Sequence, residues 1–347
     1  MNLPQLENKP YKPNFLHVFF DWLDRLPLPA WVSLLLLFPV VGLAQHLVAY
    51  GRGYLNPGEF NFDLGTAGYW LLSGPLLFIW AMKGGRQAWI DIQPLVSSDK
   101  EEHFARMYYE FFTVPKWGGT VALLIGGLTG LWMGFADKAV APAVDYAFAE
   151  LRLSTWVIGS AFIILTLYQL IRQLNIIQNL YTRVAKVDIF KPQLLYGFPK
   201  YTATFGVAIF FYIYLAPVML DPTAYASNAS YGALVLIVPL ALAMFYLPLA
   251  GMHNRLLNEK EALMAEVGGR IRTILRDIHR AAFDKKDFDN TNSMIAVHSI
   301  LLKEKDVIED LSTWPWRPGT LRGLVSAILL PVILSILRDV ISGWIGL

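Results

Sequence analysis

Histidine is the side chain in this chain most able to do chemistry inside a membrane. Of the six histidines, only His46 lies within an apolar stretch, where it could ligate haem or a chlorin or transfer a proton. Haem held by two histidines would need a second one in such a stretch, and the other five lie outside the stretches, all on the predicted cytoplasmic side. A hydrogen bond near the end of the stretch is the simpler interpretation of His46 and of its polar neighbour Gln45.

The segments between the apolar stretches hold no complete catalytic or metal-binding constellation. His279 and His298 could face each other as metal ligands, but the sequence offers no third ligand beside them. The chain has no cysteine, which excludes disulfides, thiol catalysis and cysteine-ligated metals. Phosphate-binding glycine loops, zinc-protease motifs and serine-hydrolase motifs are absent from it. We therefore expect a protein that is not an enzyme and that holds no cofactor or metal.

Composition explains why reactive residues are scarce. Of the 347 residues, 55% are hydrophobic and only 16% are charged, which is too apolar for a soluble domain of this length. The apolar residues form seven stretches, most of them close to the roughly 20 residues that cross a hydrocarbon core as a helix. The predicted spans are 30–50, 67–83, 117–135, 153–173, 201–220, 229–250 and 321–337.

The basic residues predict how these spans are oriented. If the chain crosses the membrane at each of the seven spans, 25 of the 29 lysines and arginines lie on the same side as the N-terminus. The four exceptions are Arg52, Lys138, Arg152 and Arg338. Basic residues concentrate on the cytoplasmic side of multi-span proteins. The N-terminus is therefore predicted to be inside and, with seven spans, the C-terminus outside.

The same pattern divides the chain into four parts. Residues 1–29 form a cytoplasmic segment whose apolar residues recur at helical spacing, either as an interfacial helix or as a cap packed on the bundle. Residues 30–250 hold spans one to six. Residues 251–320 are predicted to form a cytoplasmic helical hairpin and an elbow rich in tryptophan and proline. Residues 321–347 hold the seventh span and a short outer tail.

The predicted hairpin carries equal numbers of basic and acidic residues. Balanced charge favours ion pairing between helices and argues against a nucleic-acid surface. We expect the hairpin to pack on the inner extension of the fourth span or on another subunit, and we expect no nucleic acid as a partner.

Two further sets of residues are candidate functional features of the spans. Gly126, Gly130 and Gly134 form a stripe that would let two helices approach closely, either within one chain or between subunits. Tyrosines give the fifth and sixth spans a moderately polar lining, which would suit a permeation path, a lipid-binding groove or interfacial anchoring. They are Tyr201, Tyr212, Tyr214, Tyr231 and Tyr246.

Two strings carry a resemblance. RVAKVDIFKPQLLYGF, before the fifth span, and TWPWRPGTLRGLVSAILLP, entering the seventh, resemble strings in bacterial multi-span membrane proteins that have no assigned activity. The topology alone is similar to that of insect odorant and gustatory receptors, which are tetrameric ligand-gated cation channels. That similarity implies long inner helices that anchor subunits together, but the C-terminal signature of those receptors is absent here.

The sequence thus predicts an all-α integral protein of a bacterial inner membrane, crossing the bilayer several times and in contact with its lipids. Three functions stay open. The first is an oligomeric, channel-like pore made of identical copies. The second is a non-catalytic accessory or scaffold subunit of a larger membrane complex, and the third is a transporter or lipid-handling protein.

Overall fold

Most of the residues that the computed structural model describes form helices, and no strand occurs among them. These residues are 9–23, 25–140, 149–184, 189–190, 195–210, 228–285 and 288–316, together with 319, 322–323, 325–326, 329 and 333. Tyr212, Tyr214 and most of the predicted seventh span lie outside this set, as does the side chain of Tyr231.

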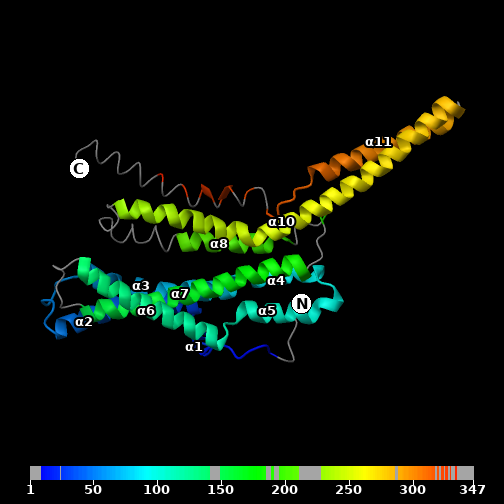
Figure 1. The fold of residues 1–347 in the computed structure, drawn as a ribbon. Helices are drawn as coiled ribbons and strands as arrows, with labels where there is room; N and C mark the ends of the chain where they lie inside the picture. The colour runs from blue at the N-terminus through cyan, green and yellow to red at the C-terminus, as the bar shows by residue number, and fades with distance from the viewer. Residues whose placement is uncertain are drawn as a thin grey trace, which may run out of the picture.

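Four long helices form the main layer of the molecule and lie side by side (Figure 1). They are α2 (Ala30–Gly51), α3 (Phe62–Gly84), α6 (Lys116–Val140) and α7 (Ala149–Asn179), and a π-helical turn, Leu180–Val184, continues α7. Four stretches are long and apolar enough to cross a membrane: Ala30–Gly51, Leu64–Leu95, Lys116–Phe135 and Leu153–Val184. The prediction of a helical protein with membrane-length apolar helices is therefore confirmed, and these stretches match the first four predicted spans.

Glycines let the long helices pack with their backbones almost in contact. A Cβ atom added at Gly68 of α3 would collide with the Phe38 backbone of α2, and one at Gly159 of α7 would lie 2.8 Å from the Trp70 carbonyl oxygen of α3. Apolar helices in lipid associate through such close packing, because lipid tails provide no hydrophobic driving force between helices. Small residues thus hold α2, α3 and α7 together.

A compact aromatic core joins this layer to shorter helices at one end. These are α4 (Arg86–Ile92), α5 (Glu101–Phe112) and α8 (Gly197–Phe210). The fully buried Trp89 of α4 is surrounded by four rings whose centroids lie 5.1 to 5.6 Å from its own, those of Phe104, Tyr108, Phe111 and Phe198. Aromatic rings bury large apolar areas, so this core anchors α4, α5 and α8 to one another.

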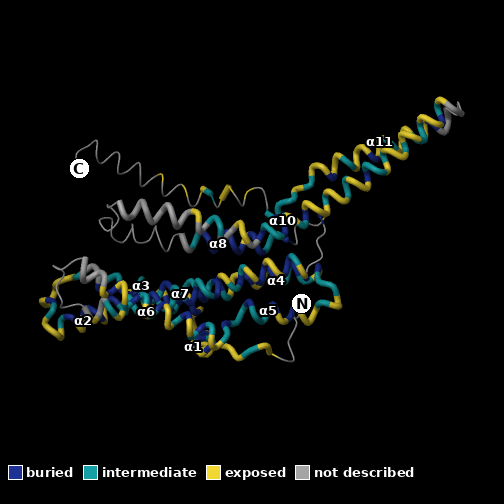
Figure 2. Tube along the Cα trace, in the orientation of Figure 1, coloured by how far each residue is buried: buried dark blue, intermediate teal, exposed yellow. Residues whose placement is uncertain are grey.

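The longest helix, α10 (Asn228–His279), leaves the bundle and continues as a projecting arm (Figure 1). Its 52 residues span about 78 Å at 1.5 Å per residue. After a π-helical turn, Arg280–Lys285, the chain returns as α11 (Phe288–Asp310), which contacts α10. Residues at the outer part of this arm are mostly exposed or half-buried (Figure 2), in contrast with the buried end of the bundle. The two predicted amphipathic stretches thus form an antiparallel pair of helices.

A heptad spacing explains how two amphipathic helices pair here. Along α11, half-buried and buried positions recur every three or four residues, and those in α10 do the same. This spacing produces a continuous contact line between two helices. The residues on the line are Lys260, Met264, Val267, Ile271, Ile274, Ile278 and Ala281 in α10, and Thr291, Met294, His298, Leu301, Lys305 and Ile308 in α11.

A short helix, α1 (Leu16–Leu23), precedes the bundle and packs on it. Leu16, Phe20 and Leu23 are buried, and the Phe20 ring stacks on that of Phe78 in α3 at a centroid distance of 5.0 Å. One face of the predicted N-terminal helix is therefore a packed cap on the bundle.

Candidate functional site

The N-terminal segment is strapped onto the junction between α5 and α6, and we call residues 11–17 the strap. Its backbone pairs with that junction: the Asn14 amide donates to the Val114 carbonyl at 2.8 Å, and the Lys116 amide donates to the Lys12 carbonyl at 3.2 Å. The Val114 amide in turn donates to Nε2 of His17 at 2.9 Å. These bonds satisfy backbone groups that a helix end would otherwise leave without partners.

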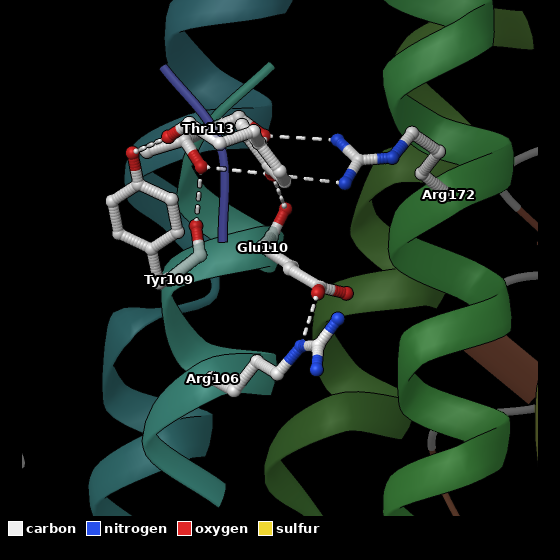
Figure 3. A network of polar contacts seen from close by, with 6 residues as sticks. Arg106, Tyr109, Glu110, Thr113 and Arg172 are labelled. Atoms are coloured by element: carbon white, nitrogen blue, oxygen red, sulfur yellow. Dashed lines mark hydrogen bonds and ion pairs between the residues drawn. The ribbon is translucent and has the colours of Figure 1, made fainter. Parts of the chain in front are cut away.

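Arg172 of α7 closes the strap from the other side (Figure 3). Its guanidinium donates to the Thr113 carbonyl and to the Tyr11 hydroxyl, both at 2.9 Å. The Tyr11 hydroxyl lies 2.9 Å from the Thr113 carbonyl oxygen and donates to it, while the Tyr109 hydroxyl donates to the Tyr11 carbonyl at 2.9 Å. An arginine presents several donors in a fixed plane, so one side chain ties the strap, the α5–α6 junction and α7 together.

Burial sets the protonation of Tyr11 and His17 in the strap. Burial raises the pKa of the Tyr11 hydroxyl above its ordinary value, while hydrogen bonds with Thr113 and Arg172 act in the opposite direction. Tyr11 therefore stays a neutral donor at physiological pH. Burial lowers the pKa of His17, and the nearby Asp21 carboxylate opposes that shift. A neutral His17 has the free Nε2 lone pair that accepts from Val114.

Two glutamines continue this network into the bundle. Gln169 and Gln173, both fully buried in α7, donate to the Phe111 carbonyl at 2.8 and 3.1 Å. The Tyr201 hydroxyl of α8 lies 2.8 Å from Oε1 of Gln173 and 3.0 Å from the Ala81 carbonyl oxygen of α3. Buried polar groups need such partners in a region without water, so this network fixes the relative positions of α3, α5, α7 and α8.

The sequence holds a partial signal for this network. Gln169, Arg172 and Gln173 follow an apolar run at a spacing of three and four residues, which places them on one face of a helix. Tyr11, the partner of Arg172 in the strap, lies in a polar segment with no comparable pattern. A single sequence therefore indicates the polar face of α7 but not what covers it.

The predicted intramembrane pair, Gln45 and His46, is buried and engaged within the chain. Nε2 of Gln45 donates to the Thr155 hydroxyl of α7 at 3.1 Å. Nδ1 of His46 lies 2.9 Å from the Gly42 carbonyl oxygen, and Nε2 accepts from the Asn61 amide at 3.1 Å. With both ring nitrogens occupied in this way, His46 links α2 to the start of α3.

The predicted glycine stripe faces α7 of the same chain. A Cβ atom at Gly126 would lie 2.6 Å from Ala161 Cα and from the Ser160 carbonyl oxygen, and one at Gly134 would lie 2.6 Å from Leu153 Cδ1. A Cβ at Gly130, midway between them, would collide with the Trp156 backbone. Of the two alternatives left open by the sequence, the structure shows the packing of two helices within one chain.

The predicted tyrosine lining is brought together only in part. Tyr201 is buried, with its hydroxyl bonded as described above. The ring of Tyr246 in α10 lies 5.3 Å from that of Trp314, where the arm returns to the bundle. The two described tyrosines therefore have separate partners. His279, one of the two histidines considered as metal ligands, contacts the edge of the Phe283 ring.

Cationic side chains at the base of the arm bond to the ends of two helices. Arg255 of α10 donates to the Tyr181 carbonyl in the π-helical turn after α7. Nζ of Lys260 lies 3.0 Å from the Leu311 carbonyl oxygen, just past α11. The His253 ring stacks on Trp314 at a centroid distance of 3.8 Å. Cations stabilise the negative end of a helix dipole, so α10 holds both the end of α7 and the end of α11.

Beyond this base, α11 carries an apolar stripe that lies off the contact line with α10. Val297, Ile300 and Val307 are exposed, with 64% of Ile300 and 57% of Val307 accessible. Glu304, which is also exposed, falls within the stripe, since the four residues are spaced by three, four and three positions. Such spacing places them on one face of the helix. We refer to these four residues as the α11 stripe.

A scan against protein-family models and searches of curated proteins and of solved structures each returned no match. The resemblance of the two sequence strings to bacterial membrane proteins therefore stays a prediction. Any assignment of function depends on the two features described above, the strap network and the α11 stripe.

Proposed function

We propose that this protein is a non-catalytic scaffold subunit of a larger membrane complex, and that the α10–α11 arm binds an unlike helical partner through the α11 stripe. In this proposal the chain crosses a bacterial inner membrane seven times, with its N-terminus and arm inside and its C-terminus outside. Four membrane-length helices and the alternating distribution of basic residues support that orientation.

The observation that carries the proposal is the α11 stripe. One face of α11 already packs on α10 along the contact line. The exposed Val297, Ile300 and Val307 lie off that line, so the hairpin itself does not need them. A helix outside the membrane that presents apolar residues every three or four positions is a surface for another helix. The arm also extends away from the bundle (Figure 1), where a partner has room to bind.

Glu304 favours an unlike partner over a second copy. Two copies in one membrane project their arms in the same direction, so a symmetric pair formed through the stripe would place Glu304 against Glu304. Like charges facing each other across helices are destabilising. Glu304 forms no ion pair within the described part of the chain. A partner helix with a lysine or arginine opposite Glu304 would neutralise the charge of this carboxylate.

The strap network suits a scaffold as well. Its hydrogen bonds connect the strap to α5, α6 and α7, and the glutamine network connects α3, α7 and α8. Fully partnered polar networks rigidify a fold. A rigid base would keep the arm at a fixed angle to the bundle, as a subunit that positions a partner requires.

Purification in mild detergent of a stripe variant tests this function. We expect the wild-type protein, extracted from its native membrane, to carry an unlike subunit in a fixed ratio, measured by native mass spectrometry. Replacing Val297, Ile300 and Val307 together by serine should remove that subunit while the helix content by circular dichroism stays unchanged. A matched control replaces Ile295 and Leu302, which are exposed on the opposite flank of the contact line, and should keep the subunit.

Two outcomes would contradict the proposal. One is a ring of identical copies that persists in the triple variant, which would favour a channel-like pore assembled elsewhere. The other is a dimer of identical copies that Glu304→Gln strengthens and the triple variant abolishes, which would make the arm a contact between copies.

A further inference from the structure

The surface of α1 is divided into three sectors. Successive helical residues are about 100° apart, so Leu16, Phe20 and Leu23 share the buried face, and His17 and Asp21 share a polar flank. The opposite flank is apolar and exposed: 72% of Val18 is accessible, as is 63% of Phe15, which directly precedes the helix. Phe19 and Trp22 lie on that flank too, and both are exposed. A helix with one packed, one polar and one exposed apolar sector fits the boundary between bundle, water and lipid.

Besides the apolar flank of α1, the bundle itself exposes apolar residues where α2 and α6 begin. At the start of α2, Leu28 and Trp31 are exposed, and further exposed apolar residues follow along the helix. At the start of α6, Trp117 is 79% exposed and begins a similar series. Exposed tryptophans at the ends of apolar helices mark a membrane–water interface. The helix α1 therefore lies at the level of the membrane surface where α2 and α6 begin.

Two lysines lie at this same level. The Lys116 amide donates to the Lys12 carbonyl, so the two residues are neighbours although they are far apart in the sequence. Both side chains are exposed, and within the described residues neither forms an ion pair. Trp117 follows Lys116 directly. Exposed lysines at a membrane surface attract anionic headgroups.

We propose that α1 is embedded in one leaflet through Phe15, Val18, Phe19 and Trp22, and that Lys12 and Lys116 bind the headgroup of an anionic phospholipid there. The strap fixes this site, because Lys12 belongs to it and its hydrogen bonds hold the start of α1 at the α5–α6 junction. The site is independent of the partner proposed for the arm, since the arm contributes no residue to it.

The depth of α1 is measurable because the chain has no cysteine. A single Val18→Cys variant, labelled with an environment-sensitive fluorophore and placed in bilayers, should be quenched by phospholipids that carry a quencher on their acyl chains. The matched control is Asp21→Cys, on the polar flank of the same helix, which should respond to an aqueous quencher instead. Equal responses at the two positions would show that α1 does not enter the leaflet, and would overturn the proposal.

The headgroup site is tested by lipid retention. In bilayers of phosphatidylcholine and phosphatidylglycerol in equal parts, native mass spectrometry should show phosphatidylglycerol enriched on the wild-type protein. Replacing Lys12 and Lys116 by glutamine should reduce that enrichment about fivefold for each charge removed. The control replaces Arg272 and Lys303, both exposed on the arm, and should leave the enrichment unchanged. Retention that is equal for both lipids, or that falls equally in both variants, would show that these lysines hold no anionic lipid.

Discussion

The Arg172 guanidinium donates a hydrogen bond to the Tyr11 hydroxyl 2.9 Å away, although 161 positions separate the two residues in the chain. The bond joins the segment before the first long helix to the fourth long helix. It can form only when α7 lies beside the α5–α6 junction, because Arg172 also donates to the Thr113 carbonyl there. The Tyr11–Arg172 bond therefore depends on the assembled bundle.

Tyr11→Phe should destabilise the protein while leaving its packing intact. The variant keeps the ring, which lies 5.5 Å from the Arg172 guanidinium carbon, but removes the hydroxyl that accepts from it. A partly buried cation that loses a hydrogen bond costs about 1 to 3 kcal/mol in the free energy of unfolding. Thermal unfolding in detergent should show a lower midpoint.

The matched control for this change is Tyr246→Phe, whose exposed ring packs on Trp314. Its midpoint should equal that of the wild-type protein. If Tyr11→Phe and Tyr246→Phe unfold at the same temperature, the strap does not contribute to stability.

His17 makes the strap sensitive to acid. Its pKa is lowered by burial from the ordinary value of 6.5, so below that pH the unfolded chain binds a proton that the folded chain does not. The stability from the Val114–His17 bond is thus present above pH 6.5 and is lost as the pH falls toward the lower folded pKa. We expect the free energy of unfolding to fall on acidification through this window, by no more than about 1.4 kcal/mol per pH unit for one group, and the unfolding midpoint to drop with it.

His17→Gln separates this effect from other titrations. Glutamine can accept from the Val114 amide through its side-chain oxygen but does not titrate, so its pH profile should be flatter than that of the wild-type protein. His103→Gln, at an exposed position of α5, should keep the wild-type profile. A steep acid transition that remains in His17→Gln would assign it to a different group.

Local sequence patterns predict the long helices but not what holds them together. Apolar length alone identifies α2, α3, α6 and α7, because crossing a membrane requires about 20 apolar residues. The start of α3 is less evident, because this helix begins at Phe62 whereas the predicted span begins at residue 67. The Asn61 side chain accepts a hydrogen bond from the Leu64 amide and so caps the helix at this earlier point. Capping residues extend a helix beyond its apolar part.

Contacts between distant segments are the part that one sequence cannot supply. The spacing of Gly126, Gly130 and Gly134 indicates that another helix approaches α6 closely. That helix could equally belong to a neighbouring subunit, and only the fold shows that it is α7 of the same chain. The strap is harder still, because Tyr11 and Arg172 share no local pattern. The heptad spacing of α10 and α11 is the intermediate case, since the turn between them is short enough to make the two stretches neighbours.

Two glycines of α6, one in the stripe and one outside it, allow a comparison within one helix. An alanine methyl group at Gly130 would collide with the Trp156 backbone, whereas one at Gly127 would meet only Val157 Cγ1 at 3.9 Å. Alanine favours a helix over glycine by about 1 kcal/mol, so Gly127→Ala should be neutral or stabilising. Gly130→Ala should lower both yield and unfolding midpoint, because α6 must move away from α7.

Size-exclusion chromatography of the same two variants gives the second readout. If the stripe packs within one chain, Gly130→Ala changes stability without changing the number of copies in the particle. Dissociation of an oligomer into stable, folded monomers would instead place the stripe between subunits.

The proposed orientation predicts which loops a membrane-impermeant maleimide reaches in intact cells. Because the chain has no cysteine, each introduced cysteine is a unique label site. Pro57→Cys, exposed between α2 and α3, should be labelled from outside, whereas Lys303→Cys, exposed on α11, should react only after the cells are permeabilised. Leu347→Cys distinguishes seven spans from six, since an odd number places it outside, where it should be labelled in intact cells. If Pro57→Cys is labelled in intact cells but Leu347→Cys is not, the number of spans is even. If instead Lys303→Cys is labelled in intact cells and Pro57→Cys is not, the arm, and any partner bound to it, lies outside the cell.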